Sequence, residues 1–207
     1  MSRMRSEGVI QFDCRWIRAP LALEISIRSI NFWRDRLRRR GFIGLYPNGY
    51  GYGNLSLRLG RSKKFLITGS QTEGIAKLGR KHYTVVESYS IRQNRLTCRG
   101  PIRASSESLT HAMVYEAGPS ACAVMHVHHR AMWKKLLNRL PTTSFKASYG
   151  TPYMAREVLR LFRQTDLPDR GIFVMGGHPD GLVVFGRDFP KALHVLVRYL
   201  HQLGNFR

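Results

Sequence analysis

The sequence is short of acidic residues, cysteines and long apolar runs, and each shortage excludes a class of protein. Thirteen Asp and Glu stand against 34 Lys and Arg, so the 207-residue chain has a net charge of +21. No apolar run approaches the ~18 residues that span a bilayer, and we expect no contact with a membrane interior. Cys14, Cys98 and Cys122 form neither a disulfide framework nor a paired metal motif. This cysteine usage, without an apolar leader after the first arginines, predicts a cytoplasmic protein.

The chain also lacks low-complexity segments, internal repeats and Pro/Ser-rich linkers. We therefore expect a single domain over residues 1–207. A content of 43% hydrophobic and 11% aromatic residues is typical of a folded chain and argues against intrinsic disorder. A chain of this length can bury one hydrophobic core.

The basic excess is spread along the whole chain, with one local peak at residues 34–40. An evenly basic protein attracts anions in general, whether phosphorylated metabolites, nucleic acid or anionic lipid. The alternative is a solvated basic surface without a specific partner. No basic and aromatic recognition motif is present, which argues against a nucleic-acid-binding protein.

Hydrophobic periodicity predicts an α/β domain built around one sheet, with helices at both ends of the chain. Helices are expected over residues 24–40, 106–115, 151–162 and from 188 to just before Gly204. Thr151 and Asp188 are expected N-caps, and Ser106 is a third. The glycine- and tyrosine-rich segment 45–53 is expected to be a loop. Strands are expected over residues 55–59, 65–68, 83–91, 95–98, 121–128, 171–175 and 182–185.

Two histidines in the apolar segment 121–128 are spaced for one face of a strand. Successive side chains alternate between faces, so His126 and His128 project together and His129 points the other way. Imidazoles at this spacing can chelate a metal such as zinc. The alternative interpretation is a pair of buried histidines that bond to the backbone.

A third histidine, His178, occupies the glycine-rich turn 176–181, directly after an expected strand. Glycine allows backbone conformations that can aim such a side chain at a site. A catalytic zinc takes three protein ligands and keeps a fourth position open, which His126, His128 and His178 would satisfy. The alternative is a turn residue without a functional role.

The segment Ala104-Ser105-Ser106-Glu107 places a carboxylate and two hydroxyls at an expected helix start. A carboxylate beside a metal can serve as general acid and base, and a helix N-terminus can bind a phosphate. His111, one turn further on, is a candidate partner of Glu107. The small-residue loops 51–56 and 68–72 can wrap an anion. The alternative is that these small and polar residues only cap a helix and form turns, which stabilises the fold without binding a ligand.

Five motifs in this order resemble the class II aldolase/adducin family: GNLS, FLITGS, SSE, HVH, and a GTP-started helix followed by a GGH turn. The resemblance covers about Arg34 to His201. It implies a central, mainly antiparallel sheet with helices on both sides. It also implies a homo-oligomer, usually a tetramer with sites between subunits.

The resemblance further implies a role for each matching position. His126, His128 and His178 would bind zinc or another divalent metal, and Glu107 would be the catalytic acid and base. The substrate phosphate would be held by Asn54, Ser70, Ser105 and Ser106, with Thr68 and Gly69 in the adjoining loop.

The implied activity is the metal-dependent cleavage of a phosphorylated sugar or related hydroxy-carbonyl compound through a stabilised enediolate. An epimerase or dehydratase with the same metal site is one alternative, and a non-catalytic adducin-like binding protein is another. The complete set of histidines and Glu107 favours an enzyme, because adducin-like relatives lack the metal ligands.

The sequence also departs from the family pattern. The segment between His128 and Gly150 is shorter than in the sugar-phosphate aldolases, which carry an active-site tyrosine there. Tyr149 lies nearby in the sequence. Pro179 and Asp180 are inserted before the usual glycine of the metal turn. These departures fall on the elements that select the substrate.

Overall fold

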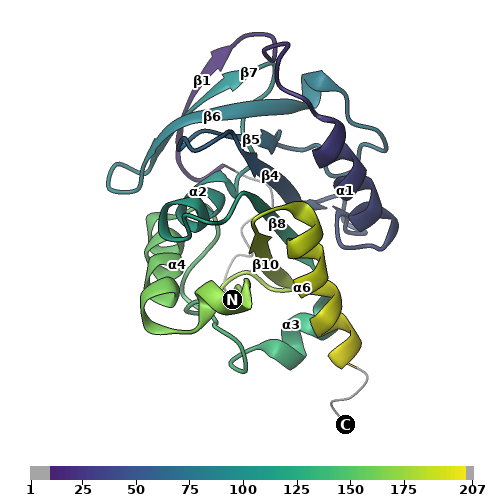
Figure 1. Ribbon diagram of the computed structural model, residues 1–207, viewed down its shortest axis with the longest axis vertical. Helices are drawn as coiled ribbons and strands as arrows, with labels where there is room; N and C mark the ends of the chain where they lie inside the picture. Colours follow the sequence, from purple (N-terminus) through teal and green to yellow (C-terminus); the bar gives the residue numbers. More distant parts are fainter. Residues whose placement is uncertain (1–9, 204–207) are drawn as a thin grey trace.

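The fold is a large mixed sheet covered by helices on both faces (Figure 1). The structure, a computed structural model, describes residues 10–203. Its eight-stranded sheet has the order β1-β7-β6-β5-β4-β8-β10-β9. The strands are β1 (Asp13–Arg18), β4 (Asn54–Arg58), β5 (Phe65–Thr68), β6 (Tyr83–Ser90), β7 (Arg95–Gly100), β8 (Ala123–His128), β9 (Ile172–Val174) and β10 (Gly181–Gly186). Strands β1 and β7 are parallel and the other paired neighbours are antiparallel, which confirms the predicted sheet.

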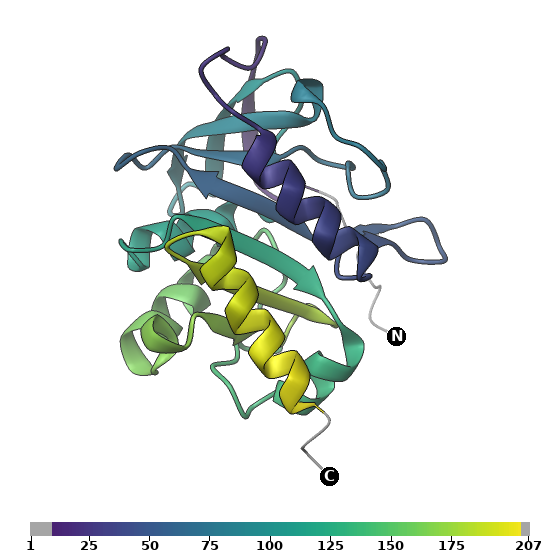
Figure 2. The same cartoon turned by 45° about the vertical axis from the view of Figure 1, so that its right-hand side comes forward.

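The helices divide between the two faces of the sheet, as Figure 2 shows for α1 and α6 on one side. One apolar core lies under α1 (Arg28–Arg39), α3 (Arg130–Leu136) and α6 (Phe189–Gln202). The other lies under α2 (Ser108–Ala117) and α4 (Pro152–Gln164). A short α5 (Leu167–Arg170) and a 3₁₀ turn (Arg80–His82) complete the helical elements of the described residues. Within residues 10–203, no helix is long and apolar enough to cross a membrane.

Two helix caps follow the local sequence chemistry. The Thr151 hydroxyl accepts a hydrogen bond from the Met154 N–H at 3.2 Å. The Asp188 carboxylate accepts one from the Lys191 N–H at 2.7 Å. Both helices carry proline in their first turn, where its missing N–H costs nothing. Gly204, expected after the last helix, lies outside the described residues.

Other boundaries differ from the prediction. Helix α1 begins at Arg28, because a turn from Ala22 to Ile25 precedes it and Leu23 stays 91% exposed. Helix α2 begins after Glu107, because the Ser105 carbonyl accepts from Ser108 and closes a turn through the expected cap Ser106. The segment expected to be a loop contains a small hairpin of β2 (Gly44–Leu45) and β3 (Gly51–Tyr52).

The fold brings together two cysteines that are distant in the sequence. The Sγ atoms of Cys14 and Cys98 lie 3.7 Å apart across the β1 and β7 pair. Both remain free thiols, as does Cys122.

A buried arginine on α1 fixes the loop after β5. Arg34 is 1% exposed, and its Nη2 donates to the carbonyls of Thr72, Glu73 and Ile75 at 3.0, 3.2 and 2.6 Å. Burial lowers the pKa of the guanidinium, but a guanidinium remains charged at neutral pH. Its hydrogen bonds therefore hold the loop 72–76 in one conformation.

We expect Arg34→Met to lower the free energy of unfolding by about 2–3 kcal/mol, because several buried carbonyls lose their donor. Urea unfolding measures this. The matched control is Arg39→Met, an exposed arginine on the same helix, with an expected change within about 0.5 kcal/mol. Equal losses in the two variants would contradict the role of Arg34.

Candidate functional site

The central strand β8 positions two histidines on one face of the sheet. It lies between β4 and β10, and all six of its residues are buried. Its side chains alternate, so Met125 joins the core under α1 and α6 while Val124 joins the core under α2 and α4. His126 and His128 share the face of Val124 and approach the start of α2.

The turn between β9 and β10 brings the third histidine to the same place. Gly176 and Gly177 lie against the carbonyl oxygens of Thr143 and Ala147, and a Cβ on either glycine would clash with them. Asp180 has a φ of +66°, so the turn reverses sharply before β10. The glycines therefore allow a tight turn that delivers His178 to the end of β8.

The three imidazoles form one cluster. His128 Nε2 lies 3.1 Å from His126 Nε2 and 3.1 Å from His178 Nε2. The ligand atoms of all three lie within 4.8 Å of one another. Burial lowers the pKa of each imidazole, that of His178 to about 4. The cluster is therefore neutral near pH 7, which is the state that binds a metal.

The outer nitrogens of two imidazoles meet polar groups that fix their orientation. The Tyr46 hydroxyl lies 2.7 Å from His128 Nδ1. The Asn54 amide lies 3.3 Å from His126 Nδ1, and its Oδ1 is buried without a hydrogen-bond partner. Turning that amide over places Oδ1 against Nδ1–H and satisfies both atoms. An Nδ1–H that is bonded in this way leaves Nε2 unprotonated, which is the form that binds a metal.

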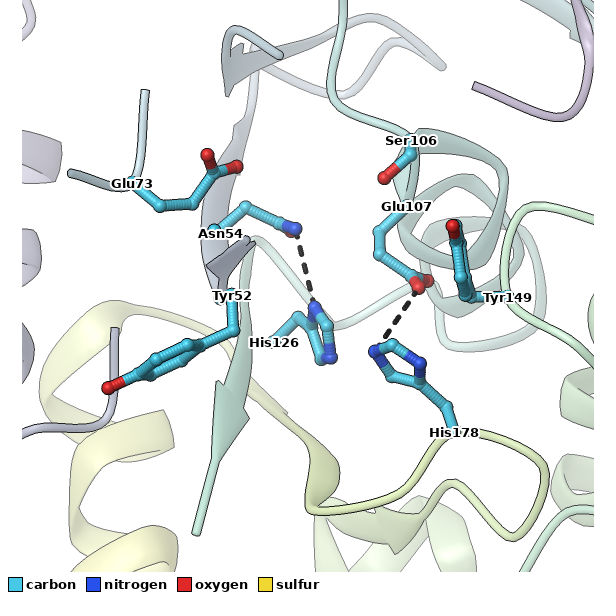
Figure 3. A pocket seen from close by; sticks show the side chains of 10 residues that line it. Tyr52, Asn54, Glu73, Ser106, Glu107, His126, Tyr149 and His178 are labelled. Atoms are coloured by element: carbon cyan, nitrogen blue, oxygen red, sulfur yellow. Dashed lines mark hydrogen bonds and ion pairs between the residues drawn. The ribbon is translucent and has the colours of Figure 1, made fainter. Parts of the chain in front are cut away.

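Glu107 lies beside the cluster at the start of α2 (Figure 3). Its Oε2 accepts a hydrogen bond from the Thr110 hydroxyl at 2.7 Å. Its Oε1 is buried without a hydrogen-bond partner and lies 3.9 Å from His178 Nε2. Burial raises the pKa of this carboxyl to about 7. Glu107 can therefore accept or give a proton near neutral pH.

A small pocket opens on this cluster, with a cavity volume of about 10 Å³, enough for about one water molecule. The predicted residues Asn54, Ser106, Glu107, His126 and His178 all line it. Its other lining residues are Gly51, Tyr52, Gly53, Glu73 and Tyr149. This volume is far below the ~300–1,000 Å³ of drug-sized sites, so binding a substrate requires the lining side chains to move.

Four other residues predicted to hold a phosphate are not among those that line this pocket. Thr68 and Ser105 are buried, and the Thr68 hydroxyl accepts from the Leu55 N–H at 3.4 Å. Gly69 pairs with Ala104, and the Ser70 N–H donates to Arg103. These residues join the loop after β5 to the segment before α2, and so support two walls of the pocket.

His111 has a different partner from the one that the sequence predicts. Its Nδ1 lies 2.7 Å from the Ser56 hydroxyl on β4, whereas Glu107 bonds to Thr110. The helix places His111 one turn inside the core, where it is 0% exposed. His129, predicted to face away from the cluster, accepts from the Met132 N–H and caps α3.

Sequence reasoning missed several residues of the site. Tyr46 and Glu73 reach it from loops and Tyr52 from the two-residue strand β3, none of which carries a periodic signal. The Tyr52 ring lies 5.3 Å from that of His128. The clustering of glycine and tyrosine in residues 45–53 was the available sign. Tyr149, noted only for its position, lies with its ring 5.0 Å from that of His178.

The sequence and fold match known proteins. Residues 47–202 match the Class II Aldolase and Adducin N-terminal domain. No curated protein is a significant match to the chain.

Solved structures share the fold at low sequence identity. L-fuculose-1-phosphate aldolase from Thermus thermophilus is 20% identical with a TM-score of 0.59, covering 85% of this chain and 89% of its own. YgbL from Klebsiella pneumoniae is 18% identical with a TM-score of 0.62, covering 84% of each chain. A sugar-phosphate aldolase from Thermotoga maritima is 15% identical with a TM-score of 0.58, covering 87% of this chain and 96% of its own. These likenesses show the fold.

Burial of His111 makes stability depend on pH in the metal-free protein. Burial lowers its pKa from 6.5 to about 3, so between these values the unfolded state binds one more proton. Stability therefore falls as the pH drops below 6.5, by up to about 1.4 kcal/mol per pH unit for this group.

We expect His111→Gln to reduce the acid slope by that amount, measured by urea unfolding from pH 7 to pH 4. His201→Gln, an exposed histidine on α6, is the control and should retain the wild-type slope. An unchanged slope in His111→Gln would contradict the assignment.

Proposed function

This chain belongs to the class II aldolase and adducin family, and from that premise we propose that it is a metal-dependent lyase. The proposed reaction cleaves a carbon–carbon bond in a sugar phosphate or a related hydroxy-carbonyl compound. The observation that carries this proposal is the cluster of three neutral imidazoles with the buried Glu107 carboxylate 3.9 Å from His178.

His126, His128 and His178 are the residues that would hold the metal. Three imidazoles with room for a further ligand are the donor set of a catalytic zinc. The neutral state of the rings and the Asn54 amide beside His126 Nδ1 fit this role. A bound divalent ion supplies Lewis-acid polarisation of the carbonyl and hydroxyl oxygens of the substrate.

Glu107 moves the proton that cleavage and its reversal require. Its Oε2 is held by Thr110, while Oε1 faces the cluster without a donor. A carboxyl whose pKa is raised to about 7 is populated in both protonation states at neutral pH. Asn54 and Ser106 orient the substrate within the pocket, and Thr68, Gly69, Ser70 and Ser105 support that end of it.

An epimerase or dehydratase would use the same histidines and Glu107. The proposal commits to a lyase, and product analysis separates the reactions, because only cleavage releases an aldehyde. The presence of all three histidines and Glu107 in one cluster favours an enzyme over a non-catalytic, adducin-like protein.

The proposal includes a homo-oligomer, as the family resemblance implies. Large apolar side chains stay exposed on α1 and in the loop before it, with Phe32 53% and Leu23 91% exposed. These side chains are available for contacts between copies.

We expect His126→Ala to lower the affinity for zinc by at least about 100-fold, because one of three ligands is lost. Zinc titration and elemental analysis of the purified protein measure this. His129→Ala is the matched control, because His129 neighbours the cluster in sequence but caps α3, and it should keep the metal. A wild-type protein that takes up no divalent metal would contradict the lyase proposal.

We expect Glu107→Gln to keep the metal and to lower kcat by about 100-fold or more, because the amide cannot transfer the proton. The assay scores aldehyde release from a panel of pentulose and hexulose phosphates and their unphosphorylated forms. Glu116→Gln, at the exposed end of the same helix, is the control and should retain activity. Full turnover in Glu107→Gln would remove Glu107 from the mechanism.

A further inference from the structure

We propose that Glu73 determines substrate specificity, by making the far end of the pocket select a hydroxyl-bearing group and reject a phosphate. This inference rests on the proposed function and narrows its substrate class to an unphosphorylated hydroxy-carbonyl compound. It replaces the phosphate that the sequence motifs predicted for the same end of the pocket.

The Glu73 side chain forms part of the pocket lining. It is 8% exposed and lines the pocket together with Asn54, Ser106 and Glu107. In Figure 3, Glu73 and Ser106 lie above His126 and His178, on opposite sides of the view. A substrate whose reacting carbonyl lies at the histidines would therefore extend its other end towards Glu73.

Two features of the fold are built around this carboxylate. Arg34 binds the backbone carbonyls of the loop on both sides of residue 73, and so fixes where the side chain begins. The carboxylate packs over Gly51 on β3, where a Cβ would clash with it. A buried cation therefore fixes the backbone at residue 73, and the carboxylate lies against bare backbone at Gly51.

No positively charged side chain lines the pocket to bind a phosphate. Of its ten lining residues, all within the described chain, none is lysine or arginine, and two are glutamates. The guanidinium of Arg34 points at the loop carbonyls and is occupied by them. A phosphate at this end would meet a buried carboxylate with little screening by solvent.

The hydrogen-bonding chemistry favours a hydroxyl. An ionised carboxylate only accepts hydrogen bonds, and phosphate oxygens are also acceptors, whereas a sugar hydroxyl donates. Burial raises the pKa of Glu73 to about 7, so the carboxylate is mostly ionised at pH 8. A like charge opposite the wrong ligand is a common means of discrimination.

The test compares matched pairs of a ketose and its 1-phosphate, with the zinc-loaded protein at pH 8 and aldehyde release as the assay. We expect the wild type to favour the unphosphorylated member in kcat/KM by at least about tenfold. Glu73→Gln should move that ratio towards the phosphate by at least about tenfold, mainly through KM, with zinc content unchanged. Glu73→Asp keeps the charge and should keep the preference.

Glu116→Gln removes a carboxylate outside the pocket and should leave the ratio at its wild-type value. If Glu73→Gln does not fold, as judged by circular dichroism, Gly51→Ala replaces it, because the added Cβ displaces the same carboxylate. A wild type that prefers the phosphate would overturn the inference, and so would a ratio that neither Glu73→Gln nor Gly51→Ala moves.

Failure of the lyase proposal is recognised separately. If the zinc-loaded wild type cleaves no ketose of either kind, that proposal fails, and the binding of inorganic phosphate decides the role of Glu73. Calorimetric titration should then show phosphate binding at least about tenfold tighter to Glu73→Gln than to the wild type. Equal affinities would overturn the inference.

Discussion

Three buried imidazoles, with His128 Nε2 held 3.1 Å from the Nε2 atoms of His126 and His178, are the constraint on which the rest of the structure depends. Burial in the sheet disfavours the protonated form of each ring. An arrangement of this kind is stabilised when a cation takes the lone pairs. The outer contacts of Tyr46 and Asn54 hold the rings in that orientation.

The same burial acts in opposite directions on the acids and the bases of the pocket. It lowers the pKa of the imidazoles and raises that of Glu107 to about 7. Below pH 6.5 the buried histidines destabilise the fold, and from about 4.5 to 7 a rising pH does the same through Glu107. The apolar cores on both faces of the sheet must offset these costs. A bound metal lessens them, because it favours both the neutral imidazole and the ionised carboxylate.

The parts of the fold that could be predicted from the sequence are those in which neighbours along the chain determine the outcome. The alternation of His126 and His128, the Gly-Gly turn before His178 and the caps at Thr151 and Asp188 all depend on local geometry. Strand β1 could not be predicted, because it is stabilised by pairing with β7, from which it is separated by more than seventy residues. The short helix α3 follows the end of β8 after a single residue, without an amphipathic repeat long enough to detect.

The candidate site divides in the same way. Its ligand-type residues are recognisable by type and spacing, whereas Tyr46 and Glu73 enter from loops whose paths depend on distant contacts. Arg34 is the clearest example, because in the sequence it belongs to a run of arginines that reads as a solvated helix face. In the structure that one arginine points inwards and bonds to the loop that carries Glu73, while Arg39 and Arg40 stay exposed.

The charge of +21 and the chemistry of the pocket act over different distances, and for that reason they do not point to the same ligand. Exposed charges attract anions towards the surface over roughly 8 Å, the screening length of physiological salt. Within the pocket, recognition depends on side chains in contact with the substrate, and there the walls carry two glutamates and no lysine or arginine. A basic surface around an acidic pocket can concentrate anions without binding them at the histidines. The net charge is therefore weak support for a phosphorylated substrate, and the position of Glu73 outweighs it.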